Sequence, residues 1–175
     1  MPENIILIGY RGSGKSSVGR RIADQVWKDF VDIDEAICKR FDGRTVAEIW
    51  ASEGEPAYRA VEVEVTEHAC AKPGQVIALG GGTLMQPRAR AAVEQADAVR
   101  IYLRCAPEEL HRRISTDPQT AGLRPSLTGQ GGGLEEINAV LAEREPVYRA
   151  VADVEFDVTF TDIDEAVRHM IARCL

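Results

Sequence analysis

The segment from Gly9 to Ser16, GYRGSGKS, has the residue types and spacing of a phosphate-binding loop. Its glycines let backbone N–H groups turn inward around phosphate oxygens, and the positive end of the following helix points at the same place. Lys15 is expected to reach the β- and γ-phosphates of a nucleotide, and the hydroxyl of Ser16 to ligate Mg²⁺. The segment follows an apolar run and opens a helical pattern, as this motif requires. The sequence therefore predicts nucleotide binding, but the loop does not identify the group that receives the phosphate.

Two carboxylates, Asp32 and Asp34, come at the end of a second apolar run, Phe30–Asp32. Their i, i+2 spacing places both on one face of an extended segment. Opposite a phosphate loop, one such carboxylate holds Mg²⁺ through water, and the other accepts a proton from an attacking hydroxyl. The same residues also fit a solvated strand end or a helix N-cap, where Asp is favoured.

Other residues with binding chemistry each have a plainer interpretation. Arg59 and Glu62 share a helix face at i, i+3, which fits a surface ion pair as well as a site. Gly80-Gly81-Gly82 follows an apolar strand, where a run of three glycines favours close approach to a ligand over a simple turn. Arg124 lies in a predicted loop. There it either closes over a γ-phosphate or is a solvated cation. Arg144 comes late in a helix and is either a site residue or solvent-facing.

The elements that must position these residues alternate between strand and helix over 175 residues, the length of one domain. Strands are predicted over 4–8, 30–32, 75–79, 99–103 and 154–160, and helices over 16–26, 36–51 with a break near Asp42-Gly43, 55–71, 87–95, 107–114, 134–148 and 163–175. The alternation predicts an α/β fold with a mostly parallel, five-stranded sheet flanked by helices, and ligands at the carboxyl ends of its strands. Residues Ser115–Gly133, with two prolines and five glycines, break the pattern and are predicted to be a functional loop such as a mobile lid.

Composition excludes several classes of protein. The net charge of −7 makes the chain a poor general binder of nucleic acid or anionic membrane. The sequence has no apolar run of the ~20 residues that cross a bilayer and no secretory signal, so a cytoplasmic location is expected. Its four cysteines form no CxxC pair and are predicted to be reduced thiols. A regulatory GTP switch is disfavoured because neither Asn-Lys-x-Asp nor Asp-x-x-Gly occurs.

Taken together, these motifs resemble the shikimate kinase family. The resemblance covers essentially the whole chain and rests on GYRGSGKSS at 9–17, DID at 32–34, EPAYRAVE at 55–62, LGGGTL at 79–84, LRPSL at 123–127 and EREPVY at 143–148. It implies a P-loop kinase fold, a three-layer sandwich with a mobile lid. It also implies ATP-dependent phosphorylation of the 3-hydroxyl of shikimate in aromatic amino-acid biosynthesis, with Mg²⁺ as cofactor. A related kinase for a sugar acid such as gluconate is the alternative.

The resemblance also assigns roles to residues. It places ATP on Gly12, Ser13, Gly14, Lys15, Ser16 and Ser17, with Ser16 and Asp32 serving Mg²⁺. Lys15, Asp34 and the lid residue Arg124 are the implied catalytic residues, and Asp34 also contacts the shikimate hydroxyls. The substrate carboxylate is assigned to Arg59 and Arg144, and a hydroxyl to the backbone of Gly81.

Two features of the resemblance leave questions open. Trp50 and Tyr58 match aromatic positions near the shikimate ring, with a core role as the alternative for Trp50. Arg112 and Arg113 compete for stacking on adenine at the root of the lid, which reads Arg-Pro-Ser and is long and glycine-rich. No obligate interface is indicated, so a monomer is expected.

Overall fold

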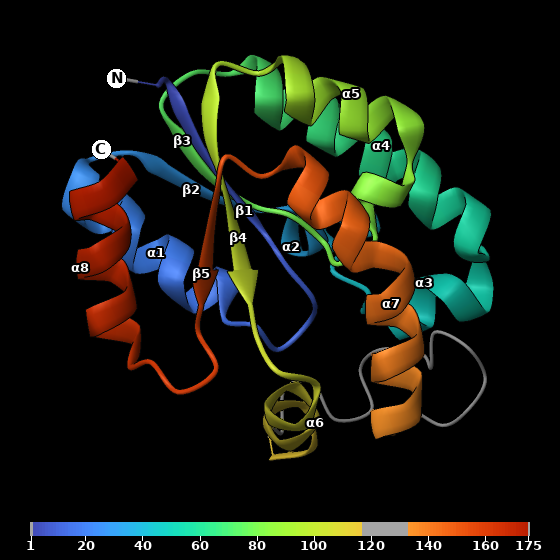
Figure 1. Ribbon diagram of the computed structural model, residues 1–175. Helices are drawn as coiled ribbons and strands as arrows, with labels where there is room; N and C mark the ends of the chain where they lie inside the picture. The colour runs from blue at the N-terminus through green and yellow to red at the C-terminus, as the bar shows by residue number, and fades with distance from the viewer. Residues whose placement is uncertain (1, 117–132, 175) are drawn as a thin grey trace.

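The computed structural model describes residues 2–116 and 133–174, which form a five-stranded sheet between layers of helices (Figure 1). The strand order is β2-β3-β1-β4-β5, and every neighbouring pair is parallel. The strands are β1 (Asn4–Ile8), β2 (Asp29–Asp32), β3 (Gln75–Ala78), β4 (Ala98–Arg104) and β5 (Val154–Asp157). The predicted α/β fold with a parallel sheet is confirmed.

Helices cover both faces of the sheet (Figure 1). On one face lie α1 (Lys15–Val26) and α8 (Ile163–Cys174), and on the other lie α4 (Glu55–Ala71), α5 (Pro87–Gln95) and α7 (Leu134–Val151). The short helices α2 (Ile33–Arg40) and α3 (Val46–Ser52) pack against α4, and the 3₁₀ helix η1 (Thr83–Met85) follows β3. Helix α6 (Pro107–Thr116) follows the carboxyl end of β4 and packs against α7. No helix within residues 2–116 and 133–174 is long and apolar enough to cross a membrane.

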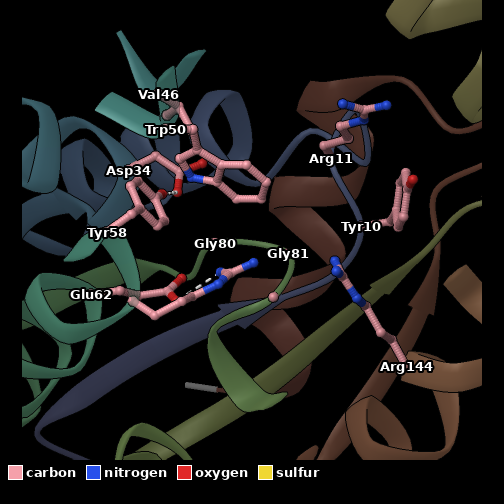
Figure 2. Close-up of a pocket in the computed structure, with 12 residues that line it drawn as sticks. Tyr10, Arg11, Asp34, Val46, Trp50, Tyr58, Glu62, Gly80, Gly81 and Arg144 are labelled. Atoms are coloured by element: carbon pink, nitrogen blue, oxygen red, sulfur yellow. Dashed lines mark hydrogen bonds and ion pairs between the residues drawn. The ribbon is translucent and has the colours of Figure 1, made fainter. Parts of the chain in front are cut away.

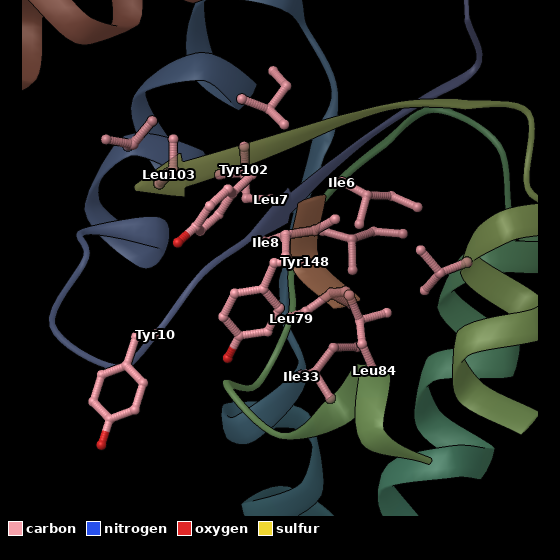
Figure 3. Packing of buried hydrophobic residues seen from close by; sticks show 14 of the residues in the cluster. Ile6, Leu7, Ile8, Tyr10, Ile33, Leu79, Leu84, Tyr102, Leu103 and Tyr148 are labelled. Carbon is pink, nitrogen blue, oxygen red and sulfur yellow. The ribbon is translucent and has the colours of Figure 1, made fainter. Parts of the chain in front are cut away.

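The core is built on the central strand β1, whose residues Ile5–Ile8 are all almost completely buried. A strand with helices on both faces is expected to be a nearly continuous apolar run, as Ile5–Ile8 are. Leu79, Leu84 and Tyr148 pack beside it at the carboxyl end of the sheet (Figure 3). The loop that follows β1 is therefore anchored to the buried core of the molecule.

The structure corrects the local conformation predicted for Asp32 and Asp34. Asp32 ends β2 and is the N-cap of α2, where its carboxylate accepts a hydrogen bond of 3.2 Å from the backbone N–H of Glu35. Asp34 lies in the first turn of that helix instead of on the strand. The prediction of an extended segment through both residues is wrong, because an Asp followed by good helix formers stabilises a helix start.

Other boundaries differ by a few residues. The predicted break near Asp42-Gly43 is confirmed, since α2 ends at Arg40 and α3 begins at Val46. Helix α6 continues through Thr116, so the first two residues of the predicted loop Ser115–Gly133 are helical. Residues 117–132, including Arg124, lie outside the described residues.

Candidate active site

The phosphate-binding loop connects β1 to α1, where its glycines take the conformations that the motif requires. Gly12 and Gly14 have φ angles of +82° and +92°, which residues with a Cβ rarely adopt. Lys15 is the first residue of α1, and its buried ammonium donates hydrogen bonds of 2.8 Å to the carbonyls of Gly9 and Tyr10. The loop therefore carries a buried cation at a helix N-terminus, an arrangement that favours an anionic ligand.

A large cavity, here called the phosphate-loop cavity, opens around this segment. Besides the loop residues from Arg11 to Ser17, its wall includes Asp32, Asp34 and Val46 from β2, α2 and α3, Arg112 and Arg113 from α6, and Asp162 and Ile163 near the start of α8. Sequence-predicted residues for ATP and Mg²⁺ that lie in the described part of the chain therefore share one wall.

Ser16 and Asp32 are brought together across this cavity. The Ser16 hydroxyl donates a short hydrogen bond to Asp32 Oδ2, while Asp32 Oδ1 caps α2. Hydroxyl and carboxylate oxygens are the donors that Mg²⁺ prefers, so the pair suits a hard cation.

A second, smaller cavity, here called the arginine cavity, adjoins the first (Figure 2). It is lined by Tyr10, Arg11, Asp34, Val46, Trp50, Tyr58, Arg59, Glu62, Gly80, Gly81, Gly82 and Arg144. Three of these residues, Arg11, Asp34 and Val46, also line the phosphate-loop cavity. The two cavities therefore meet at these side chains.

The Arg59–Glu62 pair lies in a buried network. Glu62 is 0% exposed; its Oε2 lies 2.8 Å from Arg59 Nη1, and its Oε1 accepts a hydrogen bond of 2.7 Å from Thr83. Burial raises the pKa of Glu62, while Arg59 and Thr83 act in the opposite direction. The surface-pair interpretation is wrong, because the buried carboxylate of Glu62 binds the Arg59 guanidinium in the wall of the arginine cavity.

Two aromatic rings flank the same guanidinium. The Arg59 Cζ atom lies 5.6 Å from the ring centre of Trp50 and 5.5 Å from that of Tyr58. The two rings meet edge to face at 6.1 Å. Trp50 packs partly against the core, as its core alternative predicts, and it also lines the arginine cavity. The two rings and the carboxylates of Glu55 and Glu62 together hold Arg59 in the wall of the arginine cavity.

Asp34 stands where the two cavities meet, held by a neighbouring aromatic residue. The Tyr58 hydroxyl donates a hydrogen bond of 2.8 Å to Asp34 Oδ1 (Figure 2). This contact fixes one carboxylate oxygen and the plane of the group. A group bound in either cavity would lie beside this residue.

The triple glycine lets its neighbours approach closely. A Cβ on Gly82 would lie 2.9 Å from Arg59 Nη1, and one on Gly80 would lie 2.8 Å from Asp34 Oδ1. On the other side of the cavity, Arg144 Nη1 lies 3.7 Å from the position that a Cβ on Gly81 would take. Arg144 therefore faces the site, and its solvent-facing alternative is wrong.

The structure adds residues that sequence reasoning did not single out. Tyr148 donates a short hydrogen bond to the carbonyl of Gly81, and burial raises the pKa of its phenol to about 12, so it stays a donor. Thr83 bonds Glu62, while Tyr10 and Arg11 line the arginine cavity. Thr83 lies within the motif LGGGTL and Tyr148 within EREPVY, so their membership in these motifs was the signal that could have identified them.

Comparison with known proteins supports the resemblance seen in the sequence. The family model for shikimate kinase matches residues 11–175. A shikimate kinase from Rhodopirellula baltica is 35% identical over 97% of this chain and 89% of its own length, and shikimate kinase 2 from Dickeya chrysanthemi is 40% identical over 91% and 89%.

Solved structures agree. A shikimate kinase from Acinetobacter baumannii, solved in complex with shikimate, superposes with a TM-score of 0.88 and 28% identity over 98% of this chain and 91% of its own. A gluconokinase from Sinorhizobium meliloti, at a TM-score of 0.57 and 21% identity over 98% and 90%, shares the fold alone.

Proposed function

The chain belongs to the shikimate kinase family and phosphorylates shikimate with ATP, and we propose how its residues divide this reaction. ATP lies in the phosphate-loop cavity and shikimate in the arginine cavity, so that its 3-hydroxyl meets the γ-phosphoryl group where the cavities join. The observation that carries this assignment is the pair of arginines, Arg59 and Arg144, lining a cavity that shares Asp34 with the phosphate loop.

In the donor half of the reaction, the residues from Gly12 to Ser17 bind the phosphates through their backbone N–H groups. Lys15 stabilises the charge on the phosphoryl oxygens during transfer. Ser16 and Asp32 fit Mg²⁺ through their adjoining oxygens, and the ion when bound neutralises phosphate charge. Arg124 is proposed as a further cation on the phosphates; it lies outside the described residues.

Arg112 and Arg113 are the two candidates for stacking on adenine, and Arg112 makes hydrogen bonds to fewer partners among the described residues. Both arginines bond Glu109, but Arg113 also donates hydrogen bonds to the carbonyls of Val158 and Thr159, at 2.8 and 3.2 Å. We therefore assign Arg113 to holding the loop before α8 and Arg112, which is more exposed, to stacking on the base.

In the acceptor half, Arg59 and Arg144 bind the shikimate carboxylate from two sides. Charge-assisted, bidentate contacts of this kind specify a planar carboxylate. The Gly81 backbone contacts a hydroxyl, and Asp34 accepts a hydrogen bond from the reacting 3-hydroxyl and takes its proton. Tyr58 and Trp50 lie beside the ring of the substrate.

We propose further that the chain acts as a single-domain monomer in the cytoplasm. Its net charge of −7 supports the absence of nucleic-acid and membrane partners. Because the protein as a whole is negatively charged, the two anionic substrates are attracted by the local cluster of Lys15, Arg59 and Arg144.

The assignment of the acceptor is tested by coupled ADP release with ATP and Mg²⁺ across shikimate, gluconate, quinate and CMP. We expect rapid ADP release with shikimate and little without an acceptor. A preference for gluconate or CMP of tenfold or more would overturn the proposal.

Replacing Arg59 by Lys tests the carboxylate clamp. Lysine keeps a cation beside the buried Glu62 but loses the planar fork, so kcat/KM for shikimate is expected to fall by roughly 10–150-fold, the equivalent of one charge-assisted hydrogen bond. The loss should largely vanish with a shikimate analogue whose carboxylate is reduced to an alcohol.

Both acceptors are measured on parent and variant as a double cycle. Equal fractional losses for shikimate and for the alcohol would show that Arg59 does not bind the carboxylate.

A further inference from the structure

Among the described residues, Arg11 is the single cation that lines both the phosphate-loop cavity and the arginine cavity. It belongs to the phosphate loop, two residues after β1. Asp34, from α2, lines both cavities as well, and the two side chains approach the site from different elements (Figure 2). A group that passes from one cavity to the other therefore passes beside Arg11.

The guanidinium of Arg11 is held loosely. Its Nη2 atom lies 3.7 Å from Oε1 of Glu136, a completely buried carboxylate in the first turn of α7. This distance allows charge attraction but exceeds that of a good hydrogen bond. The Nε atom is buried and has no hydrogen-bond partner. The side chain is thus placed by Glu136 and by the ring of Tyr10, whose centre lies 6.0 Å from Arg11 Cζ, while its Nε donor remains unused.

Arg11 is the third arginine that lines the arginine cavity, so we look for an anionic group that Arg59, Arg144 and Lys15 do not already bind. The shikimate carboxylate is assigned to Arg59 and Arg144, and Lys15 lies deeper in the phosphate loop, bonded to loop carbonyls. The remaining anion is the phosphoryl group in transit, whose oxygens match the fork of a guanidinium. Arg11 is also next to Gly81, since its backbone N lies 3.5 Å from the position of a Cβ there.

We propose that Arg11 contacts the transferred phosphoryl group, first on ATP and then on the phosphorylated product. The inference rests on the proposed function. In the step, the 3-hydroxyl oxygen forms a bond to the γ-phosphorus, and the bond from that phosphorus to the β–γ bridging oxygen breaks. ADP leaves with the electron pair, and the hydroxyl proton passes to Asp34. The phosphoryl oxygens carry negative charge on both sides of the step, so a cation where the cavities join contacts them throughout.

Four ligands, each titrated alone by calorimetry with Mg²⁺ present, test this role. Two carry the transferable phosphoryl group or its analogue, AMP-PNP and shikimate 3-phosphate, and two lack it, ADP and shikimate. In Arg11→Met, we expect affinity for the first two to fall roughly 10–150-fold. Affinity for ADP and shikimate should change less than threefold. No turnover interferes, because the second substrate is always absent.

Two further variants sharpen the test. Arg11→Lys keeps the charge without the fork and should lose less affinity for the two phosphoryl ligands than Arg11→Met does. Arg90→Met removes a cation that pairs with Glu94 on α5 and lines neither cavity, and should match the parent for all four ligands. Neither change at Arg11 strains the backbone, since its φ is not positive.

The alternatives give different patterns. Equal losses for all four ligands in Arg11→Met would show a merely structural role, and unchanged affinities would show no contact; either result overturns the inference. A parent protein that binds nucleotide but not shikimate would instead overturn the proposed function, and this inference with it.

Discussion

Replacing Lys15 by Met is expected to abolish phosphoryl transfer, lowering kcat by roughly 10³-fold or more, because a preorganised charge at the reacting phosphoryl group is lost. The structure places the ammonium at the first residue of α1, buried beside the glycines that surround the phosphates. Methionine has a similar length and no charge, so it keeps the packing of the loop while removing the contact to the γ-phosphate.

The same substitution has a smaller effect on stability. The ammonium donates hydrogen bonds to the carbonyls of Gly9 and Tyr10, both at 2.8 Å. Their loss costs about 1–3 kcal/mol, equivalent to a decrease in Tm of about 2–4 °C for each kcal/mol in a domain of this size. The far-UV circular dichroism spectrum should stay that of the parent, since the core around β1 does not involve this side chain.

Coupled ADP release and a thermal melt on the same preparation separate the two effects. Lys72→Met serves as the control, because Lys72 is exposed, pairs with Asp29 and lines neither cavity. Turnover above a tenth of the parent rate in Lys15→Met would contradict the role of the loop in catalysis.

The phosphate loop could be predicted from sequence because its determinants are local. Gly12, Gly14 and Lys15 lie within four residues, and the conformation follows from their own backbone preferences and from the strand and helix on either side. The helix Glu55–Ala71 was predicted with its observed bounds for a similar reason, with Gly54 before it and Pro56 in its first turn.

Burial, by contrast, depends on what packs from elsewhere in the chain. The i, i+3 spacing of Arg59 and Glu62 is the same for a surface pair and for a buried one. Contact with Thr83, 21 residues away, decides between them. The i, i+2 spacing of Asp32 and Asp34 predicts a shared face only where the strand continues through both. The hydrogen bond from the Glu35 backbone N–H to Asp32 instead begins a helix at this point.

Residues at the meeting point of the two cavities were hardest to predict. Arg11 occupies a variable position of the phosphate-loop pattern, and its proximity to Glu136 joins segments 125 residues apart. Tyr148 reaches Gly81 from α7, 67 residues away in the chain. Such contacts follow from the order of the strands in the sheet, which alternation of helix and strand alone does not determine.

Replacing Asp34 by Asn is expected to lower kcat by about 10²–10⁴-fold with little change in KM for shikimate, the range of a lost general base. The Tyr58 hydroxyl bonds Asp34 Oδ1 at 2.8 Å, and an asparagine oxygen accepts the same bond. The side chain therefore stays in place, but the other oxygen becomes an NH₂ group, which donates and does not accept. The reacting hydroxyl then has no acceptor for its proton where the two cavities meet.

Two variants on the neighbouring helix α4 isolate this charge. Glu67→Gln removes a carboxylate that pairs with Arg88 and lines neither cavity, and it should leave kcat within threefold of the parent. Tyr58→Phe removes the orienting hydroxyl but keeps the Asp34 charge, so its kcat should fall less than that of Asp34→Asn. If Asp34→Asn also stays within threefold in steady-state assays, Asp34 is no more than an acidic residue favoured in the first turn of a helix.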